Sequence, residues 1–339
     1  MRFGIRLTLA ALGGLALAAT PAVAQDYPSR PITDVVVWAA GGGTDTVNRL
    51  IMAEMEKALG GGARINVVNR TGGVGGSAGM SYVYSQPADG YTLAGISESN
   101  VTAGVQGGWD KRFDVWYPFI VGGSPDLVSV TANAPYQSIE ELIEAAKQNP
   151  GSIRAGASAA GSIHHLNLLA LQDGTGTEFN FIPYDGSAPA QNAAVAGEVD
   201  VVVTSLAEQQ QLLRAGRLRP LAMLTPDPFT LEGVGDIPSA FGPYPGLSQY
   251  LPIGQAIGFA VRADAPDEVK EKLSAAFEQA MQSQAVKDFA ANNFYALSGK
   301  HGAEASEQFA TLESLFAWTL WDLGAASVDP ATLGIPKPE

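Results

Sequence analysis

Short apolar runs alternate with segments of helical periodicity along most of the chain. Compact apolar runs predict strands, and apolar residues spaced three or four apart predict amphipathic helices. Strands are predicted at 33–38, 65–68, 92–96, 127–131, 153–155, 179–182, 199–203, 218–224 and 256–262. Helices are predicted at 46–59, 76–85, 139–148, 162–172, 188–196, 208–215, 266–282 and 303–323. This alternation is typical of βαβ units, so we expect an α/β fold with mainly parallel sheets flanked by helices.

Two segments depart from this alternation and indicate crossings between domains. Residues 122–138 and 251–266 are extended and punctuated by Gly and Pro, with no helix between strand and turn. Two crossings make one domain discontinuous. We therefore expect a first lobe of residues 25–125 plus 255–339 and a second lobe of residues 126–254. The cleft between two such lobes is the expected ligand site.

The first residues have the pattern of an export signal. Arg2 and Arg6 precede an apolar run at 7–19, and the segment closes with Ala-Val-Ala at 22–24. Residues 1–24 are therefore predicted to be a cleaved secretory signal peptide. The apolar run is too short to serve as a membrane span.

The composition excludes several classes of site. The chain has no cysteine, so it has no disulfide, no thiolate metal site and no lipid-modified cysteine that would anchor it to a membrane. Its net charge is -14, and about -16 once the two arginines of the signal peptide are removed. Nucleic acids and anionic membranes are poor partners for such a field. We expect a soluble monomer, free in a bacterial periplasm.

The stretch "VVVWAAGGGTDTVNRL" at 35–50 carries the first candidate for ligand chemistry. A strand enters a triple-glycine turn, and a helix follows with Thr44 as its expected cap. Glycines leave no Cβ to block an approaching ligand, and the amides of a helix N-terminus favour anions. The turn therefore predicts a carboxylate site, although the same arrangement also occurs where a helix simply packs on a strand.

A second glycine turn leaves an alternative function open. Residues 73–78 match the dinucleotide fingerprint, follow a strand and open a helix, and Glu98 ends the next strand, where a ribose-binding acid would lie. The alternative is a secreted NAD-type oxidoreductase. Against it, an exported chain has no ready supply of nicotinamide cofactor, and the turn at 41–43 has no role in that fingerprint.

The three histidines and the serines were considered as catalytic or metal-binding residues. His164 and His165 are adjacent, so on a helix they point ~100° apart and cannot chelate one metal together. We expect His165 to lie beside the Ser162 cap and donate to a carboxylate, and His164 to face solvent. No Gly-x-Ser-x-Gly elbow is present. We expect neither an enzyme, nor a metal site, nor a cofactor.

Five motifs in order and spacing resemble one known family. They are "YPSRPITDVVVWAAGGGTD" at 27–45, "VVNRTGGVGGSAG" at 67–79, "PADGYTL" at 87–93, "AGSIHHL" at 160–166 and "IPYDGSAPAQNAAVAGEVD" at 182–200. The chain resembles the Bug-type substrate-binding proteins of tripartite tricarboxylate transporters over nearly its whole mature length. The resemblance implies a two-lobed periplasmic binding fold of the second topological type. It also implies that the protein captures a small carboxylate by clamshell closure and delivers it to the membrane permease subunits.

The resemblance also implies a set of binding residues. In this family the first glycine turn holds the ligand carboxylate, the second closes over the same end, and loops of the second lobe add further donors. Transferred motif by motif, the expected ligand-binding residues are Ala40, Gly41, Gly42, Gly43, Thr44, Asp45, Gly73, Gly75, Ser97, Ser99, Ser158, Ser162, His165, Tyr184, Asp185 and Ser187.

Three departures from the family pattern bear on specificity. Ala40 stands where the family usually has proline, and Asp185 stands where it frequently has lysine or arginine. If Asp185 faces the cleft, it would repel a second carboxylate and favour an amine, an amide or a hydroxyl; if it faces solvent, it carries no such information. Residues 238–255 also differ from the family's usual stretch, so the far wall of the pocket is not predicted.

Overall fold

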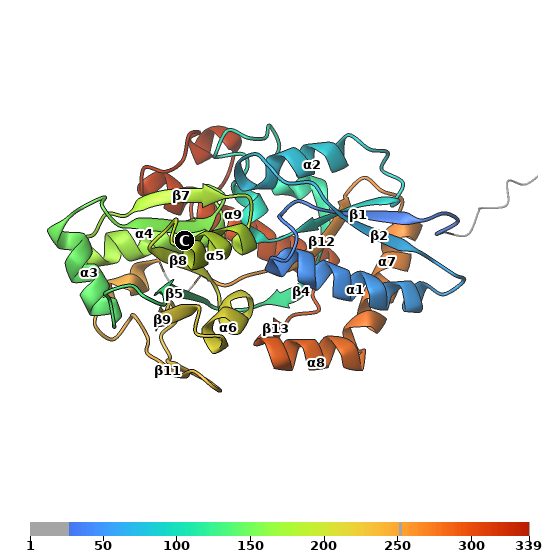
Figure 1. Cartoon of the computed structure of the whole chain (residues 1–339). Coiled ribbons are helices and arrows are strands. Elements are labelled where there is room, and N and C mark those ends of the chain that lie inside the picture. The colour runs from blue at the N-terminus through green and yellow to red at the C-terminus, as the bar shows by residue number, and fades with distance from the viewer. Residues whose placement is uncertain (1–26, 251–252, 339) are drawn as a thin grey trace, which may run out of the picture.

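The computed structural model describes residues 27–250 and 253–338, which form two α/β lobes, each with its own sheet (Figure 1). The predicted signal peptide lies outside the described residues. Within the described residues, no helix is both long and apolar enough to cross a membrane.

The six-stranded sheet belongs to the first lobe. Its order is β13-β4-β12-β3-β1-β2. The strands are β1 (Ile32–Val36), β2 (Ile65–Asn69), β3 (Thr92–Ile96), β4 (Trp116–Gly123), β12 (Ile257–Arg262) and β13 (Ala296–Leu297). β1 pairs in parallel with β2 and β3, whereas β12 is antiparallel to both β3 and β4.

The five-stranded sheet belongs to the second lobe. Its order is β7-β6-β8-β5-β9, with β6 parallel to β7 and β8, and β5 antiparallel to β8 and β9. The strands are β5 (Asp126–Thr131), β6 (Arg154–Ser158), β7 (Asn180–Tyr184), β8 (Val201–Ser205) and β9 (Leu218–Met223). A separate hairpin pairs β10 (Phe229–Leu231) with β11 (Gly235–Ile237). The two-lobed α/β fold is confirmed. Both sheets are mixed rather than mainly parallel, because β12 in the first lobe and β5 in the second lobe run antiparallel to their neighbours.

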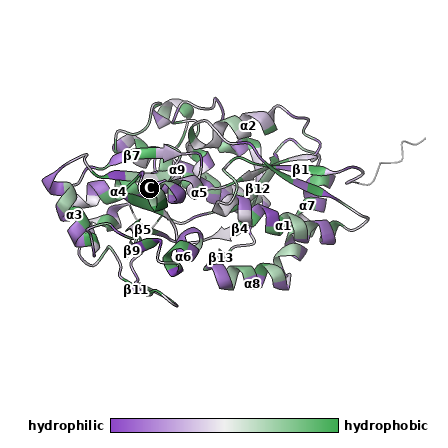
Figure 2. Cartoon of the chain, viewed as in Figure 1, coloured by the Kyte–Doolittle hydropathy of each residue, from purple (hydrophilic) through white to green (hydrophobic). Residues whose placement is uncertain are grey.

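Helices flank both sheets. They are α1 (Gly43–Leu59), α2 (Ser77–Tyr84), α3 (Ile139–Gln148), α4 (Ile163–Thr175), α5 (Ser187–Ala196), α6 (Leu206–Arg214), α7 (Asp267–Met281), α8 (Gln284–Asn293) and α9 (Gly302–Asp322). Their amphipathic pattern is visible in Figure 2, where hydrophobic and hydrophilic residues lie side by side on one helix. In α3, for example, Ile139, Leu142 and Ile143 are buried while Glu140 and Glu141 are exposed. Burial of these stripes against the sheets forms the cores.

Five strands and helices were missing from the sequence-based prediction: β4, β10, β11, β13 and α8. β4 contains Pro118, which lacks an N–H and argues against a strand inside a sheet, yet it pairs opposite Ala260 in the middle of β12. α8 follows α7 after a break at Ser283, whose hydroxyl caps the second helix by accepting from Val286 N. The predicted helix 266–282 matches α7 and ends at this break, so the prediction contained α7 but not α8.

Candidate functional site

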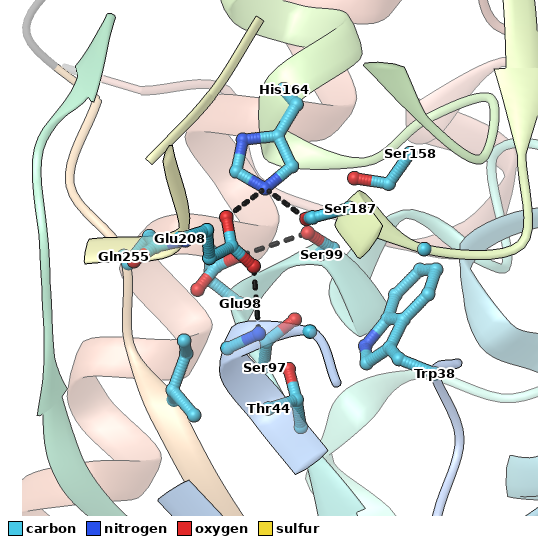
Figure 3. A pocket seen from close by; sticks show the side chains of 14 residues that line it. Trp38, Thr44, Ser97, Glu98, Ser99, Ser158, His164, Ser187, Glu208 and Gln255 are labelled. Carbon is cyan, nitrogen blue, oxygen red and sulfur yellow. Dashed lines mark hydrogen bonds and ion pairs between the residues drawn. The ribbon is translucent and has the colours of Figure 1, made fainter. Parts of the chain in front are cut away.

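A small cavity lies between the lobes, at the carboxyl ends of the parallel strands (Figure 3). The segments after β1 and β3 supply its first-lobe wall, and the segments after β6, β7 and β8 supply its second-lobe wall. This edge is where open α/β sheets bind ligands. The site is therefore built by loops that leave five separate strands.

The lobes meet directly across this cavity. Gly43 N donates to Glu208 Oε1 at 2.7 Å, Ile163 N donates to Ser99 Oγ at 2.9 Å, and Ala39 N donates to the carbonyl of Asp185 at 3.1 Å. The remaining volume is about 20 Å³, which is room for roughly one water molecule. The structure is therefore a closed form, and a larger ligand requires the lobes to separate.

Some of the predicted residues line the cavity. α1 begins at Gly43, with Gly42 as its N-cap in an extended conformation, and Ser97 caps the 3-10 turn Glu98–Thr102. The predicted residues in the wall are Gly42, Gly43, Thr44, Ser97, Ser99, Ser158 and Ser187. The structure thus brings the first glycine turn together with hydroxyls from both lobes, and their role in binding remains a prediction.

Other predicted residues lie outside the wall. Ala40 and Gly41 are exposed, Tyr184 is half-buried at the end of β7, and Ser162 caps α4 by accepting from His165 N. Asp185 is exposed as well, so its carboxylate does not face the cavity, although its carbonyl bridges the lobes.

Asp45 is buried in a network on the outer side of the turn. Its Oδ2 accepts from Gly41 N at 2.9 Å and from Arg49 Nε at 3.0 Å, and its Oδ1 accepts from Asn69 Nδ2 at 2.8 Å. Burial alone would raise the pKa of Asp45, but these hydrogen bonds and the Arg49 charge lower it below its usual value. Asp45 therefore holds the turn in shape and does not line the cavity.

The second glycine turn packs against protein. A Cβ on Gly73 would lie within 2.3 Å of Ser77 Oγ, and one on Gly75 within 2.9 Å of Ala103 N. Both glycines have positive φ and neither lines the cavity. The would-be ribose acid, Glu98, is buried and accepts from Ala256 N at 2.6 Å. The second turn therefore does not offer its amides to the cavity, which argues against the dinucleotide alternative.

The two adjacent histidines differ from their predicted roles, although His165 does lie beside the Ser162 cap. His164 is buried and lines the cavity, with its Nδ1 2.7 Å from Asp126 Oδ2. His165 lies outside the cavity, stacks on Phe181 at 4.0 Å between ring centroids and accepts from Gly161 N at 3.1 Å. The prediction that His164 faces solvent is wrong, because every residue in the first turn of α4 is buried.

The charge state of the two histidines also differs. Burial alone would lower the pKa of His164, but the carboxylates of Asp126, Glu208 and Glu98 raise it to about 9. Burial without a charged partner lowers the pKa of His165 to about 4. His164 is therefore an imidazolium at neutral pH, and His165 is neutral.

Ser187, His164 and Asp126 reproduce the connectivity of a hydrolase triad. Ser187 Oγ is 3.1 Å from His164 Nε2, and His164 Nδ1 contacts Asp126. A general base must have a free nitrogen to take the serine proton. Protonated His164 has none, so Nε2–H donates to Ser187 Oγ, and the group acts as a cationic hydrogen-bond donor facing the cavity.

Glu98 and Glu208 are functional candidates that the sequence reasoning did not place in the pocket. Both are fully or nearly fully buried and both line the cavity, close to His164 in Figure 3. Glu208 Oε2 accepts from Ser205 N and Ser205 Oγ in a capping box at the start of α6. The Ser-x-x-Glu spacing at 205–208 signals that cap, but nothing local shows that the other oxygen crosses to Gly43. Trp38, Gly186, Gln255 and Ile257 complete the wall.

The fold and site together define a two-lobed solute-binding protein of the periplasmic type, not an enzyme. The family described as the tripartite tricarboxylate transporter family receptor matches residues 47–309. The chain belongs to this family, which confirms the resemblance noted from its motifs.

This chain is similar in sequence to other bacterial proteins and similar in fold to solved structures. A UPF0065 protein of Pseudomonas sp. strain P51 is 31% identical over 64% of this chain, and the match covers 66% of that relative, just under two thirds of its length. The periplasmic binding protein BugD has a TM-score of 0.79 at 24% identity, covering 88% of this chain and 99% of its own. R. palustris Rpa4515 with adipate has a TM-score of 0.76 at 26% identity, covering 89% and 99%.

Proposed function

We propose that this protein captures a small carboxylate between its lobes and delivers it to the membrane permease of a tripartite tricarboxylate transporter. In this proposal residues 1–24 direct export and are removed after Ala24, and the protein acts free in the periplasm. The lobes are residues 25–125 plus 255–339, and residues 126–254. Membership of the receptor family supports the transport role, and the adipate-bound relative supports a carboxylate.

The observation that carries the proposal is the buried imidazolium of His164. It faces the cavity, and Asp126 behind it holds its proton. Its Nε2–H donates to Ser187 Oγ, and a ligand carboxylate that takes the place of this hydroxyl would gain a charge-assisted hydrogen bond. Hydroxyls of Ser158, Ser187 and Thr44 lie in the same wall.

Capture requires the closed form to open and close again around the ligand. Opening breaks the direct interlobe contacts, and closure replaces some of them by contacts to the ligand. Hydrogen bonds to a charged group contribute ~1.5–3 kcal/mol each, and micromolar affinity needs ~8 kcal/mol in all. About four or five such bonds, less the cost of association and closure, reach that range.

Ligand-dependent thermal unfolding tests the proposal. The purified protein, freed of carried-over ligand by unfolding and refolding, is heated with mono-, di- and tricarboxylates, amino acids and nicotinamide cofactor. A ligand at ~100 times its dissociation constant adds ~2.7 kcal/mol, a rise of roughly 5 °C for a chain of this size. We expect a rise with a carboxylate-bearing compound and none with the cofactor. Silence from every carboxylate would refute the function.

Gly42→Val is expected to abolish ligand binding while the protein stays folded. Gly42 has φ -78° and ψ 174°, which any residue can adopt, and a Cβ there has only ordinary contacts, the nearest with Ala39 O at 3.5 Å. The rest of the valine would fill the space beside Glu208 and obstruct closure. Exposed Gly242, which is remote from the cavity wall, provides the matched control Gly242→Val. Calorimetric affinity equal to wild type in a folded Gly42→Val protein would contradict the location of the site.

A further inference from the structure

The ionisable side chains that line the cavity are mostly acidic. They are Glu98, His164 and Glu208, and no lysine or arginine of the described residues joins them in the wall. Asp126 contacts Nδ1 of His164, and Glu208 Oε2 lies 3.6 Å from its Nε2. Together with Glu98, three acidic groups therefore act on a single imidazolium. Tyr295 lies close by, and burial raises the pKa of its hydroxyl well above the usual value, so it stays neutral and adds no charge to the wall.

Glu208 already occupies the amide that the first glycine turn offers. Its Oε1 accepts from Gly43 N at 2.7 Å across the cleft. Its carboxylate is thus placed where the sequence predicted a ligand carboxylate. A ligand carboxylate directed to the same amide would meet a like charge at contact distance, which is strongly unfavourable inside a protein. His164 Nε2 is the one cationic donor in the described wall, but it too lies 3.6 Å from Glu208 Oε2, so a ligand carboxylate bound there needs a positive charge beside it.

Glu98 adds a second carboxyl group to the wall. Burial raises its pKa, and a positive charge placed beside it would favour its ionised form. One of its oxygens accepts from Ser99 Oγ at 2.8 Å and the other from Ala256 N at 2.6 Å. A carboxylate has about four acceptor positions, so Glu98 retains capacity for further donors. Figure 3 shows Glu98 and Glu208 on the same side of the cavity, below the His164 ring. An ammonium group has three donors and one positive charge to offer such a pair.

We infer that the ligand of this cavity is a small carboxylate that also carries a protonated amine, with the carboxylate at His164 and the ammonium at Glu98 and Glu208. This inference rests on the proposed function and names its ligand class. A dicarboxylate would place its second negative charge against the two glutamates. A zwitterion adds no net charge to a wall in which acidic groups outnumber basic ones, and its ammonium offsets the neighbouring carboxylates.

Matched pairs of ligands test this inference by calorimetry. Each pair keeps the number of methylenes and exchanges one carboxylate for an ammonium. The pairs are succinate and β-alanine, glutarate and 4-aminobutanoate, and adipate and 5-aminopentanoate. Aspartate and glutamate, which have two carboxylates and an ammonium, are added to the set. We expect the tightest amine-bearing ligand to bind at least tenfold more tightly than its matched diacid. Equal or tighter binding of the diacids would overturn the inference and leave the proposed function standing. No binding by any member of either set while another carboxylate binds would also overturn the inference, and silence from every carboxylate would refute the proposed function itself.

Two charge-neutralising variants assign the preference to the named side chains. Glu208→Gln keeps the capping-box residue type at the start of α6, and Glu98→Gln keeps one acceptor oxygen. We expect each variant to shrink the ratio of amine-ligand affinity to diacid affinity at least tenfold. Exposed Glu232, in the hairpin of the second lobe, provides the control Glu232→Gln, which should keep the wild-type ratio. A folded Glu208→Gln, Glu98→Gln double variant with the wild-type ratio would overturn the assignment.

Discussion

His164→Gln is expected to lower the affinity for the carboxylate ligand by about 100-fold at pH 7. The substitution removes the only imidazolium in the wall of the described cavity. A hydrogen bond from a charged donor contributes about 1.5–3 kcal/mol, and the upper end of that range corresponds to about a hundredfold in the dissociation constant. Titration calorimetry of wild type and variant with the same ligand measures the effect.

The neighbouring histidine provides the control for this experiment. His165→Gln also removes an imidazole from the first turn of α4, but that ring is neutral and lies outside the cavity. It should lower stability through the lost stacking on Phe181 and leave affinity nearly unchanged. Equal losses of affinity in the two variants would show that the first turn of α4, and not the charge of His164, controls binding.

The ion pair between His164 and Asp126 predicts how the stability of the protein depends on pH. The folded-state pKa of His164 is raised to about 9, above its ordinary 6.5. A base whose pKa is raised on folding stabilises the native state fully below the unfolded value, and this contribution is lost as pH rises through the folded value. The stability difference between wild type and His164→Gln should therefore shrink between pH 6.5 and about 9. A difference that grows over this window would contradict the assigned charge.

Asp34→Asn is expected to raise the free energy of unfolding at pH 7 by about 4 kcal/mol. Asp34 lies in β1 between Val67 of β2 and Leu93 of β3, fully buried, and neither carboxylate oxygen has a hydrogen-bond partner. Burial raises its pKa from 3.8 to about 8, with a smaller contribution from Asp45. Folding at pH 7 thus requires proton uptake over about three pKa units, at 1.36 kcal/mol per unit. Asparagine removes this requirement.

The pH dependence gives this prediction its sign. Between pH 4 and 8 the native state binds the Asp34 proton and the unfolded state does not, so wild-type stability falls as pH rises. The gain from Asp34→Asn should be absent below pH 4, grow to pH 8 and then stay constant. Denaturant unfolding at several pH values measures it, with exposed Asp110→Asn as the control. A gain independent of pH would show that Asp34 is ionised in the folded protein.

Much of the fold was predictable because its signals are local. The first glycine turn and the Ser162 cap follow from residues within four positions of one another, and both form as the sequence indicated. The predicted Thr44 cap is wrong, because α1 begins at Gly43 with Gly42 as its N-cap. β4 was not predictable in the same way. Pro118 argues against a strand locally, and only its long-range neighbours β12 and β13 favour one.

The sequence by itself determined the α/β class, the glycine turns, most of the helix starts and the family to which the chain belongs. Only the tertiary structure decided which charges share the cavity. Asp126 contacts His164 from 38 residues away, and Glu208 reaches Gly43 over 165 residues. Periodicity and capping depend on neighbours a few residues apart. Burial and pKa depend on groups that folding brings together, so the acid–imidazolium cluster and the charge of its ligand could be inferred only once both lobes were in place.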